Sequence, residues 1–236
     1  MLPIAILAGG LATRLRPATE TIPKALIDIN GEPFISHQLR LLKDAGAERV
    51  VICIGHLGDS IREFVGNGRR FGLEVEYSPD GPELRGTAGA IRNALPLLGE
   101  QFFVLYGDSY LPCDYRAVER TYFENGQAGL MTVFRNQNRW EQSNVEFVEG
   151  RIVAYDKRLI TDRMEYVDYG LSIFHKSAFA TSGVPATDLA TVFQELIAGG
   201  KLAGFEVNER FYEVGSWNGI QTLRAHLSPA ATTTCI

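Results

Sequence analysis

The sequence predicts an α/β protein with a mixed, mostly parallel sheet, and two observations carry this prediction. Over residues 1–125, short apolar runs alternate with amphipathic stretches, which is the pattern of strand–helix–strand units. From Ala128 onward, predicted strands follow one another with few helices between them, which indicates an antiparallel extension of the same sheet. Since no linker rich in Pro, Gly or Ser interrupts the chain, residues 1–227 are expected to form one domain, followed by a disordered tail over 228–236.

The elements of the first half alternate in type. Strands are expected where apolar residues cluster, at 4–8, 49–54, 74–78 and 102–106. Helices are expected where apolar residues recur every three or four positions, at 34–45, 61–65, 87–94 and 115–125. Asp59 and Ser60 offer side chains that can cap the second of these helices.

The second half is richer in strands. These are expected at 130–134, 145–149, 151–156 and 169–174, with Glu149 and Gly150 forming a tight hairpin turn between the middle pair. Two helices, expected at 188–198 and 217–227, complete the domain.

Composition narrows the class of protein. With 45% apolar and 22% charged residues, the 236-residue chain is suited to a large globular core. The formal net charge is −5 and the basic residues are scattered, which argues against nucleic acid as a partner. The three cysteines form no CxxC pair, so neither a disulfide framework nor a zinc site is supported. The first apolar run is about seven residues long, too short for a signal peptide or a membrane span, so a cytoplasmic protein is expected.

A glycine turn follows the first predicted strand, at the edge where α/β sheets bind ligands. Gly9 and Gly10 allow close approach of the backbone to a ligand, while Thr13 and Arg14 bring a hydroxyl and a positive charge. Lys24 adds a second cation after a proline. This combination indicates phosphate binding, although a tight turn with surface arginines has the same pattern. Neither GxxxxGK[ST] nor GxGxxG is present.

Two further segments suggest a ligand site. Gly86 and Thr87 precede an amphipathic helix, where small residues leave room for a flat nucleotide base. Glycine is also common before helices for purely structural reasons. Asp108 follows the most apolar strand. Because an ionised carboxylate at the edge of a core needs a partner, it is a candidate ligand of Mg²⁺, with a capping role as the alternative.

Taken together, these segments resemble the sugar-1-phosphate nucleotidyltransferases, whose signature is approximately LxGGxGTRLxPLT followed by PKP. The positions that match are Leu7, Gly9, Gly10, Thr13, Arg14, Leu15, Pro17, Thr19, Pro23 and Lys24. Ala12, Ala18 and Ala25 depart from it. The resemblance covers residues 1–226 and implies the three-layer α/β/α sandwich of the nucleotide-diphospho-sugar transferase type, without the β-helix domain of longer members.

The resemblance also implies roles for individual residues. Arg14 and Lys24 would act in catalysis, and Asp108 with Glu213, which replaces the family's usual aspartate, would hold Mg²⁺. Lys157 would hold the sugar phosphate. Substrate contacts would come from Ala8, Gly9, Gly10, Thr13, Gly86 and Thr87 around the nucleotide, with segment 78–85 beside it, and from Asn144, Glu146 and Asp168 around the sugar.

The implied activity joins a nucleoside triphosphate to a sugar 1-phosphate, giving a nucleotide sugar and pyrophosphate. GTP with a mannose- or heptose-type 1-phosphate is expected, and uridylyl transfer to an amino-sugar or muramic-type 1-phosphate is the alternative. Two other classes of protein stay open. One is a glycosyltransferase, although Asp108-Ser109-Tyr110 lacks the Asp-x-Asp that is usual there. The other is a non-catalytic nucleotide-sugar sensor. No membrane partner is expected, and the sequence leaves monomer and homodimer open.

Overall fold

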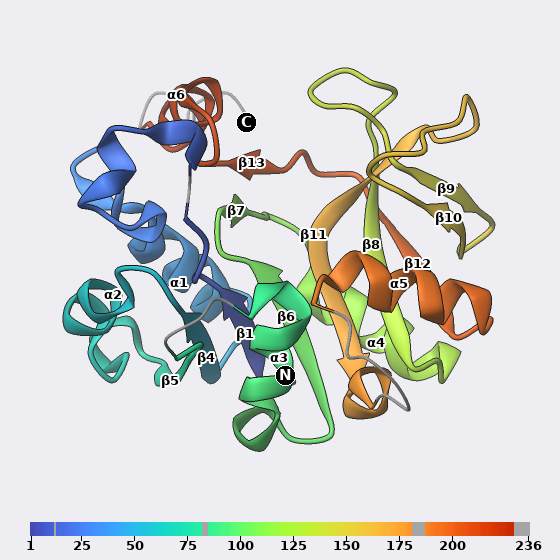
Figure 1. Ribbon diagram of the computed structural model, residues 1–236, viewed down its shortest axis with the longest axis horizontal. Coiled ribbons are helices and arrows are strands. Elements are labelled where there is room, and N and C mark those ends of the chain that lie inside the picture. Colours follow the sequence, from blue (N-terminus) through green and yellow to red (C-terminus); the bar gives the residue numbers. More distant parts are fainter. Residues whose placement is uncertain (12, 82–84, 181–186, 229–236) are drawn as a thin grey trace, which may run out of the picture.

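The computed structural model describes residues 1–11, 13–81, 85–180 and 187–228. Within these residues the centre is a nine-stranded sheet with the order β5-β4-β1-β6-β11-β8-β12-β10-β9 (Figure 1). Its strands are β1 (Ile4–Leu7), β4 (Arg49–Ile54), β5 (Glu74–Pro79), β6 (Gln101–Tyr106), β8 (Gly129–Arg135), β9 (Val145–Val148), β10 (Arg151–Tyr155), β11 (Tyr166–His175) and β12 (Leu202–Val207). Two short ribbons pair β2 (Asp28–Ile29) with β3 (Glu32–Pro33) and β7 (Ser109–Tyr110) with β13 (Tyr212–Glu213).

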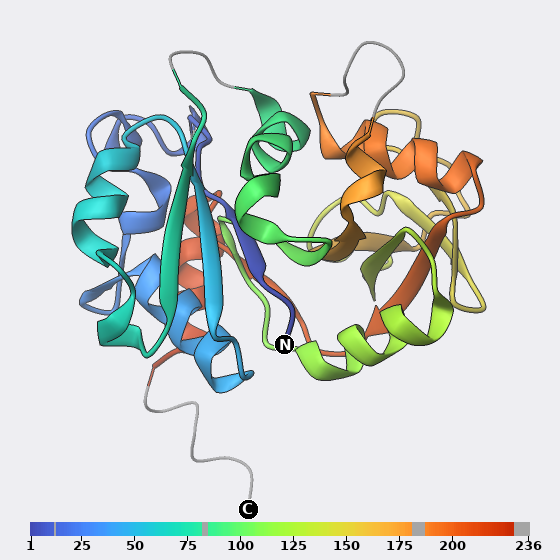
Figure 2. The same ribbon diagram turned by 90° about the horizontal axis from the view of Figure 1, so that it is seen from below.

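The helices lie on both faces of the sheet, as Figure 2 shows. They are α1 (Phe34–Asp44), α2 (Gly58–Val65), α3 (Gly86–Leu98), α4 (Tyr115–Asn125), α5 (Leu189–Ala198) and α6 (Trp217–His226). Apolar side chains of α1, α2 and α4 pack in one core cluster, and those of α3 and α5 pack in another. The predicted three-layer α/β/α arrangement is confirmed.

In the parallel half of the sheet, the burial of the strands accounts for their apolar sequences. β5, β4, β1 and β6 all pair parallel. Ile4 and Ile6 face the first cluster, whereas Ala5, between them, faces the second. Because both faces of the central strands β1, β4 and β6 are covered, these strands are largely continuous apolar runs, whereas the edge strand β5 alternates polar and apolar residues.

The second half is mostly antiparallel, as predicted, but the prediction missed one strand of the central sheet, β12, and the short β13. β12 lies parallel to β8, with Leu202 opposite Gly129. Gly204 interrupts the apolar pattern of β12, and a Cβ there would lie 2.6 Å from the ring of Phe147. This glycine therefore serves close packing inside a strand and does not mark a turn.

Three helix predictions need correction. The helix expected at 87–94 runs on to Leu98 through Pro96, because Leu98 is buried and a proline removes only one backbone donor. Asp59 and Ser60 do not cap α2, which begins at Gly58 after Leu57 in a left-handed conformation. Asp188, expected as the first residue of α5, is its cap and accepts a hydrogen bond from the Ala190 N–H.

The hairpin prediction is confirmed, since Glu149 and Gly150 both have positive φ between β9 and β10. Ser228 is the only residue of the predicted tail within the described part of the chain. None of the described helices is long and apolar enough to span a membrane.

Candidate functional site

Two adjacent cavities open beside the carboxyl end of β6, and the first of them also borders the carboxyl ends of β1 and β4. The first has a volume of about 370 Å³ and lies between the glycine turn after β1 and the start of α3. The second, of about 390 Å³, lies between β11 and the segment that carries β13. Tyr106, Asp108 and Lys157 line both cavities and form their shared wall.

The glycine turn lines the first cavity through Ala8, Gly9 and Gly10. The Ala8 N–H donates to the Cys53 carbonyl at 2.9 Å, which ties the turn to the end of β4. A Cβ on Gly9 would lie 3.1 Å from the Gly55 nitrogen, so the close approach of the two loops requires a residue without a bulky side chain. Ala12 and the side chain of Thr13 lie outside the described part of the structure.

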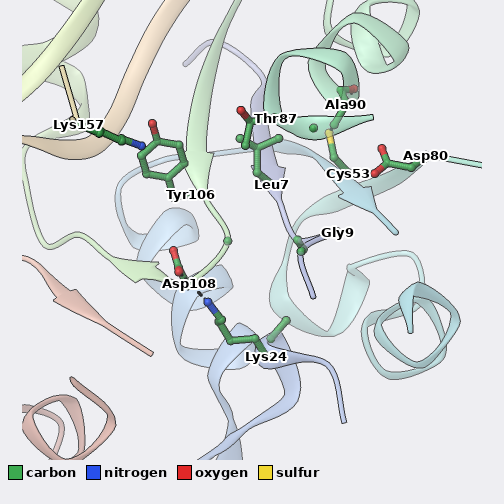
Figure 3. Close-up of a pocket in the computed structure, with 15 residues that line it drawn as sticks. Leu7, Gly9, Lys24, Cys53, Asp80, Thr87, Ala90, Tyr106, Asp108 and Lys157 are labelled. Carbon is green, nitrogen blue, oxygen red and sulfur yellow. Dashed lines mark hydrogen bonds and ion pairs between the residues drawn. The ribbon is translucent and has the colours of Figure 1, made fainter. Parts of the chain in front are cut away.

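The cation of Lys24 meets the carboxylate of Asp108 across the mouth of the first cavity (Figure 3). Lys24 Nζ lies 2.9 Å from Asp108 Oδ2, with the two side chains 20% and 32% exposed. These residues are 84 positions apart in the sequence. The fold therefore brings together two of the predicted site residues as an ion pair.

The position of Asp108 is set by the close approach of β6 and β1 at their ends. A Cβ on Gly107 would lie only 2.2 Å from the Leu7 carbonyl oxygen. The Gly107 N–H donates to this same carbonyl at 3.1 Å. Glycine before the acid is therefore a steric requirement of the fold.

Glu213 reaches the same place from the end of the chain. The ribbon of β7 and β13 pairs Glu213 with Ser109, and the Val214 N–H donates to the Asp108 carbonyl at 2.9 Å. The Glu213 carboxylate accepts hydrogen bonds from the Gly215 N–H and, at 2.5 Å, from the Ser216 hydroxyl. It thus turns back onto its own loop while remaining beside Asp108.

The space between these acids is formed by the missing side chain of Gly215. A Cβ there would lie 2.8 Å from Glu213 Oε2, 3.3 Å from Asp108 Oδ2 and 3.4 Å from Arg14 Nη2. Among the described residues no group of three or more His, Cys, Asp or Glu could hold a metal. Because Mg²⁺ commonly takes one or two carboxylates together with substrate phosphates, this pair of acids fits it.

Arg14 is placed differently from the rest of the glycine turn. It lies on a short 3-10 helix, Thr13–Leu15, and lines the second cavity near Glu213 and Ser216. Its guanidinium therefore approaches the shared wall from the side opposite Gly9.

Lys157 extends from the loop after β10 along two tyrosine rings. Its Nζ lies 5.7 Å from the ring centre of Tyr106 and 5.9 Å from that of Tyr155. Both tyrosine hydroxyls donate to Asp168 Oδ2, at 2.8 and 3.3 Å. Burial raises the pKa of Asp168, while the Lys157 charge and these hydrogen bonds oppose the rise.

Asn144 and Asp168 are brought together, since the Asp168 N–H donates to Asn144 Oδ1 at 3.2 Å and both residues line the second cavity. Glu146 lines neither cavity. It is buried on β9, where its carboxylate forms an ion pair with Arg163 at 3.3 Å. The structure therefore places Glu146 outside both cavities with its charge paired to Arg163, and its contact with the sugar stays a prediction.

Gly86 and Thr87 line the first cavity, as expected for residues beside a nucleotide. Thr87 has a structural role as well. Its hydroxyl accepts from the Leu189 N–H at 2.8 Å and donates to Asp188 at 3.3 Å, which joins the starts of α3 and α5.

Sequence reasoning did not single out two charged residues of the site. Asp80 is 6% exposed and lines the first cavity, and its Oδ1 has no hydrogen-bond partner among the described residues. Burial raises its pKa. Its only signal in the sequence was its place in segment 78–85, directly after β5. Arg210 lines the second cavity from the loop before β13, and no motif marked it.

Comparison with known proteins adds independent findings. A family model described as nucleotidyl transferase matches residues 4–226. The chain is 43% identical over 117 residues to the N-acetylmuramate alpha-1-phosphate uridylyltransferase of Neisseria meningitidis serogroup B, covering 49% of this chain and 51% of that protein. It is 27% identical over 217 residues to mannose-1-phosphate guanyltransferase beta-B of Xenopus laevis, covering 89% of this chain and 60% of that protein. The matches thus span about half to three fifths of these relatives.

A solved structure supports the same fold. The crystal structure of HddC from Yersinia pseudotuberculosis complexed with GMP-PN superimposes with a TM-score of 0.77 at 22% identity, covering 97% of this chain and 100% of that chain. The architecture is therefore the nucleotide-diphospho-sugar transferase fold.

Proposed function

Because the chain belongs to the nucleotidyl transferase family, we propose that it transfers a nucleotidyl group from a nucleoside triphosphate to a sugar 1-phosphate and releases pyrophosphate. The observation that carries this proposal is the placement of Lys24 and Asp108, 2.9 Å apart, between the glycine turn and Lys157. The first cavity would take the nucleotide and the second the sugar. Their shared wall is where the two phosphate groups would meet.

In the proposed reaction an oxygen of the sugar 1-phosphate attacks the α-phosphorus. The bond from the α-phosphorus to the bridging oxygen breaks, and its electrons leave with pyrophosphate. Lys157 orients the attacking phosphate, while Lys24 and Arg14 neutralise the charge that develops on the leaving group. Positioning and charge neutralisation are the main demands of such a transfer, so no covalent intermediate with the protein is required.

Asp108 and Glu213 are the residues that would hold Mg²⁺, with the gap beside Gly215 between them. When bound, the ion supplies further charge neutralisation to the triphosphate. Lys24 neutralises Asp108 in the protein described here, and an arriving triphosphate gives Lys24 a second anionic partner. Lys24 would therefore pair with Asp108 in the free protein and with the triphosphate when the nucleotide is bound.

For the base we propose guanine, because of Asp80. An ionised carboxylate only accepts hydrogen bonds, and the edge of guanine presents two adjacent donors, N1–H and the exocyclic amine. The edge of uracil presents one donor between two carbonyl acceptors, which a carboxylate repels. The buried, unpartnered Oδ1 of Asp80 in the wall of the first cavity suits guanine better.

For the sugar, two candidates are supported by different relatives. A mannose- or heptose-type 1-phosphate is supported by the similarity to the mannose-1-phosphate guanyltransferase over 89% of the chain. A muramic-type 1-phosphate, with UTP as the nucleotide, is supported by the higher identity of 43% to the uridylyltransferase over 49% of the chain.

The test is a matrix of GTP, UTP, dTTP and ATP with several sugar 1-phosphates, in the presence of Mg²⁺, in which pyrophosphate release is followed. GTP is expected to give the fastest release. Lys24→Ala and Asp108→Asn are each expected to lower turnover by about 10²-fold or more, since each removes a preorganised charge. Lys201→Ala, an exposed lysine before β12, is the control.

Three outcomes would contradict the proposal. Nucleotide binding without pyrophosphate release from any pair would favour a sensor. Sugar transfer from a nucleotide sugar to an acceptor would favour a glycosyltransferase. Normal turnover of Lys24→Ala would show that the ion pair has no part in the reaction.

A further inference from the structure

Arg210 holds an unpaired positive charge in the wall of the second cavity. Its guanidinium carbon lies 4.6 Å from the ring centre of Trp140 and 5.3 Å from that of Tyr212. Its Nε is buried without a hydrogen-bond partner, and no acidic side chain in the described ranges lies within ion-pair distance of it. Arg210 is partly exposed, and a half-buried guanidinium without an acidic partner is suited to bind an anion that enters the cavity.

The neighbouring cations differ from Arg210 in this respect. Lys24 has Asp108 as its partner. Lys157 lies near Asp168, whose pKa is raised by burial, and the Lys157 charge opposes that rise. Arg210 instead contacts two aromatic faces, which stabilise a cation and leave the edge of its planar fork free to bind an anion.

The aromatic residues that hold Arg210 are themselves fixed. Trp140 lies in the loop between β8 and β9, and its backbone N–H donates to Asn136 Oδ1 at 3.3 Å. Asn136 is fully buried and also donates to the Glu141 carbonyl at 2.5 Å. The ring of Tyr212, on the other side, stacks on His226 of α6 at 4.1 Å. The guanidinium is therefore positioned before any ligand arrives.

We propose that Arg210 recognises a carboxylate on the sugar, so that the substrate is an acidic sugar 1-phosphate such as a hexuronic acid or a lactyl ether. A carboxylate matches the guanidinium fork with two parallel hydrogen bonds. The inference rests on the proposed activity and specifies its sugar. Because Asp80 lines only the first cavity and Arg210 only the second, the choice of base and the choice of sugar substituent are separate questions.

The test compares sugars that differ only in the carboxylate: glucuronic acid 1-phosphate with glucose 1-phosphate, and N-acetylmuramic acid 1-phosphate with N-acetylglucosamine 1-phosphate. The wild type is expected to prefer the acid in at least one pair by tenfold or more in kcat/KM. Arg210→Gln is expected to lower kcat/KM for that acid by about 10- to 100-fold, the range for a hydrogen bond to a charged group. The neutral partner should change less than threefold.

Three controls keep the result specific. Arg210→Lys keeps the charge without the fork and should recover part of the preference. Arg151→Gln, an exposed arginine at the start of β10, should behave as wild type. Binding of each sugar 1-phosphate, measured by calorimetry without nucleotide, provides a readout that needs no turnover.

Equal use of both members of each pair, with Arg210→Gln unaffected, would overturn the inference while leaving the proposed activity intact. A loss of the same size for acidic and neutral sugars would also overturn it, because Arg210 would then contact the shared phosphate. If no pair gives product, the binding preference for the acid still decides the role of Arg210, and the proposed activity is decided separately by the wider matrix of triphosphates and sugar 1-phosphates.

Discussion

Asp80 is the residue on which the choice of base depends. It is nearly buried, one of its oxygens lacks a partner in the described structure, and Arg85 binds its backbone carbonyl, with Nε donating at 2.7 Å. A buried acceptor without a partner costs about 1–3 kcal/mol of stability. Such a cost is typical of groups that are satisfied only when a ligand binds.

Asp80→Asn is expected to lower the ratio of kcat/KM for GTP to that for UTP by tenfold or more. The amide offers one donor and one acceptor, which suits the uracil edge and removes one acceptor for guanine. The ratio is measured with one sugar 1-phosphate held constant. An unchanged ratio would show that Asp80 does not contact the base.

The same substitution predicts a pH dependence of stability. Burial raises the pKa of Asp80, so the folded protein holds this proton at a pH where the unfolded chain, with a pKa near 4, has lost it. Ionisation therefore lowers the free energy of unfolding as pH rises through the folded pKa, and the cost stays at higher pH. Asp80→Asn should unfold at higher urea than the wild type at pH 7.5, with a smaller difference at pH 5. A difference that grows on acidification would contradict the raised pKa.

At the scale of elements, the ends of β1 and β6 determine where Asp108 can stand. Gly107 contacts the Leu7 carbonyl so closely that any Cβ requires the strands to separate. The β7–β13 ribbon then fixes Glu213 beside Asp108 through pairing with Ser109. Two backbone arrangements, rather than side-chain packing, thus bring the acids together.

Gly107→Ala is expected to lower the free energy of unfolding by about 1–3 kcal/mol, the usual cost of overpacking a tight site. Turnover should fall as well, because Asp108 must shift. Gly10→Ala is the stability control: a Cβ at Gly10 meets nothing within 4 Å, so a change within about 0.5 kcal/mol is expected. Urea denaturation of both variants checks this, and equal effects would show that the close approach carries no strain.

At the scale of the whole molecule, charges of both signs gather at the two cavities. The net charge is −5, and the cations Arg14, Lys24, Lys157 and Arg210 line the cavities together with Asp80, Asp108, Glu141, Asp168 and Glu213. An anionic substrate is therefore attracted at short range by individual cations and not by a field of a single sign. The overall composition therefore argues against nucleic acid as a partner, but it does not argue against a small anionic substrate.

Binding of a triphosphate should stabilise the entire domain. With Mg²⁺ and GTP at about 100 times its Kd, mass action adds about 2.7 kcal/mol, which corresponds to a rise in Tm of about 5–10 °C for a chain of this size. Differential scanning fluorimetry measures the rise. Lys24→Ala should reduce it at the same GTP concentration, whereas Lys201→Ala should not. A Tm insensitive to every triphosphate would contradict the assignment of the first cavity.

Much of the fold follows from sequence patterns, and the failures have physical causes. Most of the predicted strands and helices occur within a few residues of their expected bounds. β12 was not predicted, since Gly204 interrupts its apolar run; this glycine makes room for the ring of Phe147 and the side chain of Ile152. Glu146 was grouped with the sugar contacts by the family resemblance and stays a prediction, while its ion pair with Arg163 depends on a loop elsewhere that no local pattern indicates.

By itself, the sequence determined the alternation of strands and helices, the glycine turn after β1 and the acid after β6, because these depend on local spacing and on the order of polar and apolar residues. Only the tertiary structure decided that Lys24 meets Asp108, that Glu213 lies beside it, and that Asp80 and Arg210 carry unsatisfied polar groups into the cavities. Whether a charge has a partner is a property of distances between segments far apart in the chain, and no local pattern encodes those distances.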